Sequence, residues 1–260
     1  MKIVKKVLLG IAILLLAIVV LIGVLIAKNA PANVKAMNKS VDTYLETVGK
    51  YYSLTEVDCG EYKDLKLFGI MKFKVKQYHV EGVGNLAVMT TNFGVMQMAT
   101  VVLVPTERDM PLVSMDYMYI LGNRTAYLEF YDLVLEQDNE YAALLKELGT
   151  VREEYSSIET ATPSEAWYDS LKTVGFYKKG SKADDDALIE MLQKGLEKVM
   201  AYGQTLPELD DEKHALKATI QKTYSNGLID NGGISTDIFV KALGPDETRM
   251  FFDSVLFKAE

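Results

Sequence analysis

The chain has 260 residues and a formal net charge of −8. Its first 28 residues contain four lysines and no acidic residue, so the rest carries −12, which argues against nucleic-acid partners because they select a basic surface. The single cysteine, Cys59, excludes an internal disulfide. The sequence has neither a C-x-x-C motif nor a Cys/His cluster, so no metal site is predicted.

The N-terminal segment 7–27 is apolar and carries no charge. As a helix it would be about 30 Å long, which matches the hydrocarbon core of a bilayer. We therefore expect residues 1–28 to form a transmembrane anchor. The alternative is a cleaved signal peptide with an A-x-A site at Ala30 and Ala32, but the apolar region of a signal peptide is usually about 7–15 residues long.

Lysines lie on both sides of this apolar segment, so the positive-inside bias is weak. A short N-terminal stub before a long domain favours a stub that stays inside the cell. The expected arrangement is a single-pass protein of the cell membrane with an extracytoplasmic domain.

After the anchor, residues 29–33 are predicted to be a short Pro/Ala linker. Apolar residues recur every three or four positions over 35–52, which predicts an amphipathic helix resting on the domain. We therefore divide the chain into an anchor (1–28), a linker with a packing helix (29–65) and a main domain (66–260).

The middle of the chain has the alternating or apolar character of β-strands. The predicted strands are 66–75, 76–91, 94–104, 110–121 and 124–135. The dipeptide Gly122-Asn123 lies between the last two and is a hairpin signal. Short connections between successive strands favour an antiparallel sheet.

The remainder is predicted to be helical. The expected helices are 138–148 ending at Gly149, 184–202, 208–224, 235–243 and 246 to about 257. Their apolar stripes are those of helices that pack on a core. A helix followed by a run of strands and then a run of helices is typical of an α+β fold.

Two polar residues stand out at 77–81. If this segment is extended, His79 and Glu81 face the same side of the sheet. A histidine and a carboxylate on one face can hold a proton near neutral pH. The simpler interpretation is a solvent-facing polar pair, because His-x-Glu often arises by chance.

Asp116 lies in an otherwise apolar and aromatic strand. A carboxylate in such a place is paired, solvated in a cleft, or raised in pKa by burial. With a raised pKa it could donate a proton at neutral pH. The alternative is a carboxylate at an edge or cavity that takes no part in catalysis.

Other motifs accompany these residues in a fixed order. Pro105 and Pro111 precede Asp116. The later motifs are Tyr131-Asp132-Leu133, Trp167 to Lys179, Tyr224, Leu243-Gly244 and Leu256-Phe257. With His79-x-Glu81 at the start, this ordered set resembles the ferredoxin-dependent bilin reductases over 66–260.

The resemblance implies a three-layer α/β/α sandwich with a central antiparallel sheet, here preceded by one N-terminal transmembrane helix. An open-chain tetrapyrrole would lie between the sheet and the C-terminal helices. No metal or flavin would be tightly bound, and single electrons would come from an external ferredoxin-like iron–sulfur protein.

The resemblance also suggests site residues. Glu81 and Asp116 would donate protons or pair with pyrrole nitrogens, with His79 beside Glu81 as a third catalytic residue. The expected ligand-binding side chains are Thr100, Met118 and Tyr224.

Some features depart from the family pattern. Where some members carry another histidine a few residues before the proline, this chain has Thr100 or Val101. The family is soluble, and ferredoxins are acidic, so a domain of charge −12 repels them unless its charges are segregated.

Three functions are therefore compatible with the sequence. The first is an anchored reductase of a linear tetrapyrrole or a similar conjugated ligand. The second is a non-catalytic protein that holds such a ligand, or another hydrophobic molecule, at the membrane. The third is a structural or interaction module of the cell envelope, in which the Met-rich and aromatic strands only form a core.

Overall fold

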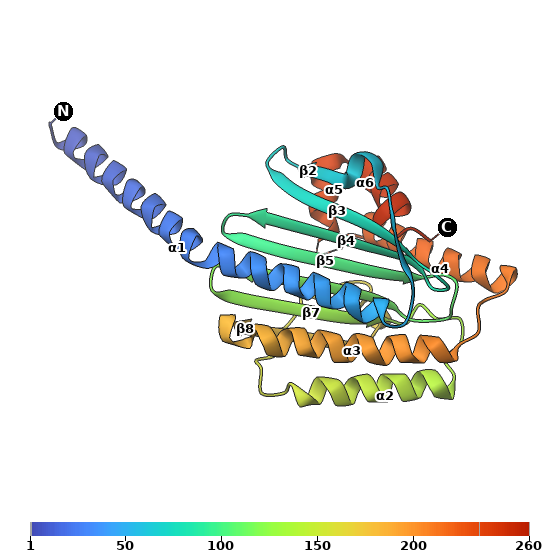
Figure 1. The fold of residues 1–260 in the computed structure, drawn as a ribbon. Coiled ribbons are helices and arrows are strands. Elements are labelled where there is room, and N and C mark those ends of the chain that lie inside the picture. The colour runs from blue at the N-terminus through green and yellow to red at the C-terminus, as the bar shows by residue number, and fades with distance from the viewer. Residues whose placement is uncertain (1, 234, 260) are drawn as a thin grey trace.

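The computed structural model describes residues 2–233 and 235–259, with the side chains of 2–5 left aside. A single antiparallel sheet lies between two layers of helices, and one long helix projects from the domain (Figure 1). This is the three-layer α/β/α arrangement predicted from the sequence.

The projecting helix is the N-terminal part of α1 (Lys2–Gly49). Its apolar side chains are exposed, and within the described part of the chain it is the one helix long and apolar enough to cross a membrane. The second part of α1 packs on the sheet, as the amphipathic pattern predicted (Figure 1).

The linker predicted at 29–33 is wrong, because α1 continues through Pro31 without a break in helical structure. Proline cannot donate the backbone hydrogen bond that a helix interior requires. Side chains on both sides of Pro31 form additional hydrogen bonds. Asn29 Nδ2 donates to the Leu25 carbonyl oxygen at 2.8 Å, and Asn33 bonds to the sheet.

The sheet has eight strands among the described residues, all paired antiparallel, in the order β1-β3-β4-β5-β6-β7-β8 with β2 also paired to β3. The strands are β1 (Leu54–Val57), β2 (Asp64–Leu67), β3 (Met71–Val80), β4 (Gly84–Phe93), β5 (Met96–Pro105), β6 (Leu112–Ile120), β7 (Asn123–Tyr131) and β8 (Lys172–Ser181).

Several predicted strand boundaries are wrong. The segment 76–91 is not one strand, because β3 ends at Val80 and the chain turns at Gly82 before β4 begins at Gly84. The segment 66–75 is not one strand but the hairpin of β2 and β3, which turns at Phe68 and Gly69. The turn between β6 and β7 lies at Leu121-Gly122, because Asn123 already pairs with Ile120.

Each predicted C-terminal helix is present. The helices are α2 (Asn139–Glu154), α3 (Asp185–Thr205), α4 (Asp211–Asp230), α5 (Thr236–Leu243) and α6 (Pro245–Phe251), followed by the π-helical turn η4 (Phe252–Leu256). Three short turns of 3-10 helix are η1 (Gly60–Lys63), η2 (Asp169–Leu171) and η3 (Lys182–Asp184). Gly149 does not end α2, which continues to Glu154.

The first face of the sheet is the side covered by α1 and α3, with α2 packed outside them against α3 and β8. Its core is apolar and closely packed. Representative side chains with no exposed surface are Tyr44, Leu103, Met115, Leu192 and Phe176.

The second face is the side covered by α4, α5, α6 and η4 (Figure 1). Its core is rich in aromatic rings that contact one another, among them Phe73, Tyr224, Phe239, Phe251 and Phe252. The polar residues of the middle strands also point to this face, so the candidate site lies here.

Candidate functional site

A cavity of about 90 Å³ lies between the second face of the sheet and the C-terminal helices, and we call it the sheet cavity. Three adjacent strands contribute Thr100, Ser114, Asp116 and Glu129 to its polar lining, and the start of α5 adds Ser235 and Thr236. Its aromatic lining consists of Tyr131, Tyr168, Tyr224, Phe239, Phe252 and Phe257. Carboxyl groups therefore face an aromatic wall.

Asp116 lies in the middle of β6, directly opposite Thr100 on β5. Thr100 Oγ1 donates a hydrogen bond to Asp116 Oδ1 at 2.5 Å. Burial raises the pKa of Asp116 to about 6; the hydrogen bonds from Thr100 and Ser114 oppose this rise, and the nearby charge of Glu129 adds to it. Asp116 can therefore exchange a proton close to neutral pH.

Glu129 on β7 is the second carboxyl group of the cavity, and it is almost fully buried. Its two oxygens accept hydrogen bonds from Tyr131 Oη at 2.7 Å and Tyr177 Oη at 3.0 Å. Lys172 Nζ lies 3.0 Å from Glu129 Oε1, so the charge of the carboxylate is compensated. Burial acts to lower the pKa of Lys172, but Glu129 and Asp169 outweigh it and raise that pKa overall.

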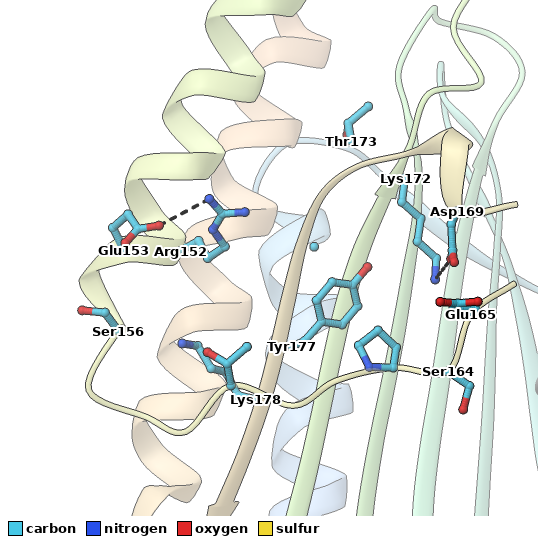
Figure 2. A pocket seen from close by; sticks show the side chains of 13 residues that line it. Arg152, Glu153, Ser156, Ser164, Glu165, Asp169, Lys172, Thr173, Tyr177 and Lys178 are labelled. Carbon is cyan, nitrogen blue, oxygen red and sulfur yellow. Dashed lines mark hydrogen bonds and ion pairs between the residues drawn. The ribbon is translucent and has the colours of Figure 1, made fainter.

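Lys172 and Tyr177, which both bond to Glu129, line a larger polar pocket of about 530 Å³ at the β8 edge, which we call the edge pocket. Figure 2 shows the Lys172 amine directed at Asp169 and the ring of Tyr177 between the strand and the 163–165 segment. The edge pocket also contains Arg152 and Lys178. Glu129 is thus bonded to two side chains that line this second pocket.

The helix that covers the cavity is held by a buried lysine. Lys217 on α4 has no exposed surface, and its Nζ donates to Asp109 Oδ1 at 3.0 Å, Met110 O at 2.8 Å and Leu133 O at 2.6 Å. Burial lowers the pKa of Lys217 to about 8, against the opposing charge of Asp109. These bonds fix α4 to two loops of the sheet, and α4 places Tyr224 over the cavity.

His79 is on the second face, as predicted, but far from Asp116. It lies on β3 near the end of the sheet, with half of its side chain exposed. It lines a separate polar pocket of about 150 Å³ together with His214 and Glu107, and His79 Nδ1 is 3.9 Å from Glu107 Oε1. The structure therefore does not bring His79 into the sheet cavity.

Glu81 lies on neither face of the sheet, so the predicted alignment with His79 is wrong. β3 ends at Val80, and the chain turns at Gly82 with a φ of 71°, a conformation that glycine adopts readily. Glu81 is exposed in this turn, with its backbone N–H bonded to the Ser53 carbonyl oxygen. Only Asp116 of the three expected catalytic residues lines the sheet cavity.

Two of the three expected ligand-binding residues line the sheet cavity. Thr100 and Tyr224 line the cavity, whereas Met118, on the same face two positions beyond Asp116, is not part of the described lining. Sequence reasoning missed Glu129 and Ser114. A signal for Glu129 existed, since it is a lone carboxylate in the apolar run of β7, as Asp116 is in β6.

Within residues 2–233 and 235–259, no group of three or more His, Cys, Asp or Glu side chains is placed to hold a metal ion. The polar groups of the sheet cavity are instead two carboxyls and several hydroxyls, with the Lys172 amine bonded to Glu129 from the edge pocket. Such a set can bind a ligand that offers N–H groups and can exchange protons with it.

Comparisons with known proteins support the fold. No family model matches the chain, and no curated protein matches it. Among solved structures, phytochromobilin synthase from tomato, crystallised in complex with biliverdin, superposes with a TM-score of 0.70 at 12% identity, covering 85% of this chain and 83% of that chain. The chain therefore has the fold of this bilin reductase, as the sequence motifs predicted.

Proposed function

We propose that this chain, which shares the fold of a bilin reductase, binds a linear tetrapyrrole or a similar conjugated ligand between the sheet and α4–α6, and that Asp116 donates a proton to it. The observation that carries the proposal is Asp116 itself, a carboxyl with a pKa of about 6 that faces an aromatic cavity. Aromatic rings suit the flat faces of a conjugated ligand, and the carboxyl suits its pyrrole nitrogens.

Reduction of one double bond of such a ligand takes two electrons and two protons. The electrons would come singly from an external ferredoxin-like iron–sulfur protein. Asp116 would supply one proton, and the carboxylate left behind would be stabilised by the hydroxyls of Thr100 and Ser114. Solvent would supply the other proton and restore Asp116.

The ligand needs more room than the sheet cavity now has. Ligand pockets usually have volumes of about 300–1,000 Å³, against about 90 Å³ here. Tyr168, in the segment before β8, and Tyr224 on α4 close the cavity with rings 6.0 Å apart at their centroids. We infer that these two rings separate when the ligand binds.

A non-catalytic ligand carrier is the second candidate, and one observation favours it. Thr100 is the residue that contacts Asp116, near the place where some bilin reductases have another histidine. A threonine hydroxyl cannot supply a proton at neutral pH as a histidine can. Such a carrier would bind the tetrapyrrole in the same cavity without reducing it.

The test is a spectral titration of the full chain in nanodiscs with biliverdin, first alone and then with reduced ferredoxin. We expect the biliverdin absorption to shift on binding and to bleach after reductant is added. Asp116→Asn should bind and not bleach. Glu81→Gln, a carboxyl change outside the cavity, should behave as the wild type does.

The outcomes separate the candidates. No spectral shift with the wild type would contradict both of them. A shift without bleaching would establish the carrier and remove the reductase. Bleaching at equal rates in wild type and Asp116→Asn would retain the activity but remove Asp116 as the proton donor.

A further inference from the structure

Three hairpin turns lie together at one end of the sheet. The antiparallel register brings the β2–β3 turn (68–70), the β4–β5 turn (94–95) and the β6–β7 turn (121–122) to this end. The apolar part of α1 leaves the domain at the same end (Figure 1). We call these turns, with the residues that flank them, the hairpin tips.

The hairpin tips carry large exposed apolar side chains. The exposed fractions are 55% for Phe68, 65% for Ile70, 39% for Phe93 and 42% for Ile120. The opposite end of the sheet differs, since the turn after β3 exposes Glu81 and the loop after β7 exposes Glu136. Apolar side chains are therefore concentrated at the end from which α1 projects.

At two tips, a residue other than glycine adopts an energetically unfavourable backbone conformation. Phe68 and Leu121 have φ angles of 52° and 51°, in the left-handed region where glycine or asparagine is favoured. Phe68 is mostly exposed, so packing within the domain does not offset this cost. A surface that covers the tip would offset this cost.

Contacts with α1 fix the hairpin tips relative to its apolar segment. Asn33 has 1% of its surface exposed. Its Nδ2 donates to Gln97 Oε1 at 2.8 Å and to the Leu121 carbonyl oxygen at 2.9 Å, while Arg124 Nη1 donates to Asn33 Oδ1 at 2.9 Å. A continuous helix with this buried clamp leaves no flexible linker between segment and domain.

A contact between Ile26 of α1 and the β4–β5 turn indicates how close the hairpin tips lie to a bilayer that α1 would span. The side chain of Ile26 lies 3.7 Å from the position of a Cβ added to Gly94, so it reaches the β4–β5 turn. Ile26 belongs to the last turn of the apolar segment 7–27, which is long enough to fill a hydrocarbon core of about 30 Å. If that segment spans a bilayer, the β4–β5 turn must lie at its interface.

Basic residues flank the most exposed tip. Lys66 and Lys72 are exposed and lie directly opposite each other on β2 and β3. Two like charges in this position destabilise a hairpin in water. Anionic headgroups would relieve this repulsion while the apolar tip enters the acyl boundary.

We propose that the domain rests directly on the bilayer that α1 spans, with the hairpin tips inserted into the boundary between headgroups and acyl chains. The occupant of this surface is the lipid bilayer itself, and the contact is independent of the ligand in the sheet cavity. The domain is then held in one orientation, with Glu81 and Glu136 at the end farthest from the membrane.

Tryptophan quenching tests this proposal in the full chain, reconstituted in liposomes of phosphatidylcholine and phosphatidylglycerol with brominated acyl chains. The variants are Phe68→Trp, Phe93→Trp and Ile120→Trp, each at its own tip. Trp167 is the single natural tryptophan and packs on the C-terminal part of α4, where its indole N–H donates to the Gly232 carbonyl oxygen, so the wild type supplies the background. Leu216→Trp, at an exposed apolar position of α4, is the matched control.

We expect the emission of each tip tryptophan to fall at least twofold in brominated liposomes, while Trp167 and the residue-216 tryptophan stay within a tenth of their values in unbrominated lipid. Equal quenching at tips and control, or none at the tips, would overturn the proposal. The three tips are separate variants, so one that fails to fold, as circular dichroism would show, leaves two that decide the result.

Discussion

The two faces of the central sheet use the same strands for different purposes, and β6 shows this within a few residues. Val113, Met115 and Tyr117 point to the first face, where they are fully buried under α1 and α3. Ser114 and Asp116 alternate with them and point into the sheet cavity. One face therefore contributes packing, while the other keeps polar groups available for a ligand.

The difference between the two faces explains how the fold can tolerate a site that lowers the stability of the folded protein. A buried carboxyl such as Asp116 destabilises a folded protein when it ionises. The closely packed first face, with side chains such as Leu103 and Leu192 fully enclosed, supplies the stability that offsets it. Changes at matched positions on the two faces should therefore have different effects.

The largest expected difference concerns two methionines of the same strand. Met115→Ala on the first face should lower the free energy of unfolding by about 2–5 kcal/mol, because it leaves a cavity in a packed core. Met118→Ala on the second face should cost less than about 1 kcal/mol, because that side chain is only half-buried. Urea denaturation of the chain in nanodiscs measures both, and equal losses would contradict the division between faces.

Asp116→Asn should stabilise the protein at neutral pH. Because burial raises the pKa of Asp116 from 3.8 to about 6, the folded chain binds the proton more tightly than the unfolded chain. Stability is thus lost as pH rises from about 4 through 6, and at pH 7 the ionised carboxyl costs up to about 3 kcal/mol. The variant should gain up to that amount at pH 7 and nothing below pH 4.

Denaturation midpoints from pH 3.5 to 8 measure this gain. The control is Asp42→Asn, an exposed carboxyl of α1 on the first-face side of the molecule. The gain of Asp116→Asn relative to this control should grow as the pH rises from 4 to 7. A gain for Asp116→Asn that persists at pH 3.5 would show that the ionisation of Asp116 is not its cause.

A smaller effect is expected from a glycine that contacts the aromatic cover of the second face. A Cβ at Gly227 of α4 would lie 2.5 Å from Trp167 Cη2. Gly227→Ala should therefore displace the Trp167 ring, which is 40% exposed, and shift its emission to the red. The stability change should stay within about 1 kcal/mol, since alanine also favours the helix.

Gly149→Ala is the matched control for this variant. Gly149 lies inside α2, over the first face, and a Cβ there would meet nothing within 4 Å. This change should stabilise the chain by about 0.5–1 kcal/mol and leave the emission of Trp167 unchanged. A red shift in both variants would mean that the emission does not report the cover of the cavity.

The elements of this fold are largely encoded in local patterns, and so they could be predicted. Strands and helices follow from alternation, apolar stripes and capping residues. The β2–β3 hairpin was missed because Phe68 and Ile70 prolong the apolar pattern of a strand through its turn. If these side chains contact lipid, as we propose, the apolar residues of this segment serve membrane contact and not packing in the core.

The sequence predicted a site residue only where the residue could be identified without knowing which strands are neighbours. Asp116 is identified by being a carboxylate in an apolar strand. Glu129 becomes its neighbour through the pairing of β6 with β7, and His79 is separated from it by the width of two strands. Such distances depend on register and strand order, which a single sequence does not encode locally.

The smallest predicted effect lies within the cavity and tests whether its two carboxyls act as a pair. Glu129→Gln removes a charge that raises the pKa of Asp116, so that pKa should fall below about 6. It should remain above 3.8, because burial is the larger cause. Lys172→Met should move it upward, since the charge of Glu129 then loses the amine 3.0 Å away. Carbon-13 NMR titration of the labelled Asp116 carboxyl measures both shifts, and shifts of the same sign would show that the pair is not coupled through charge.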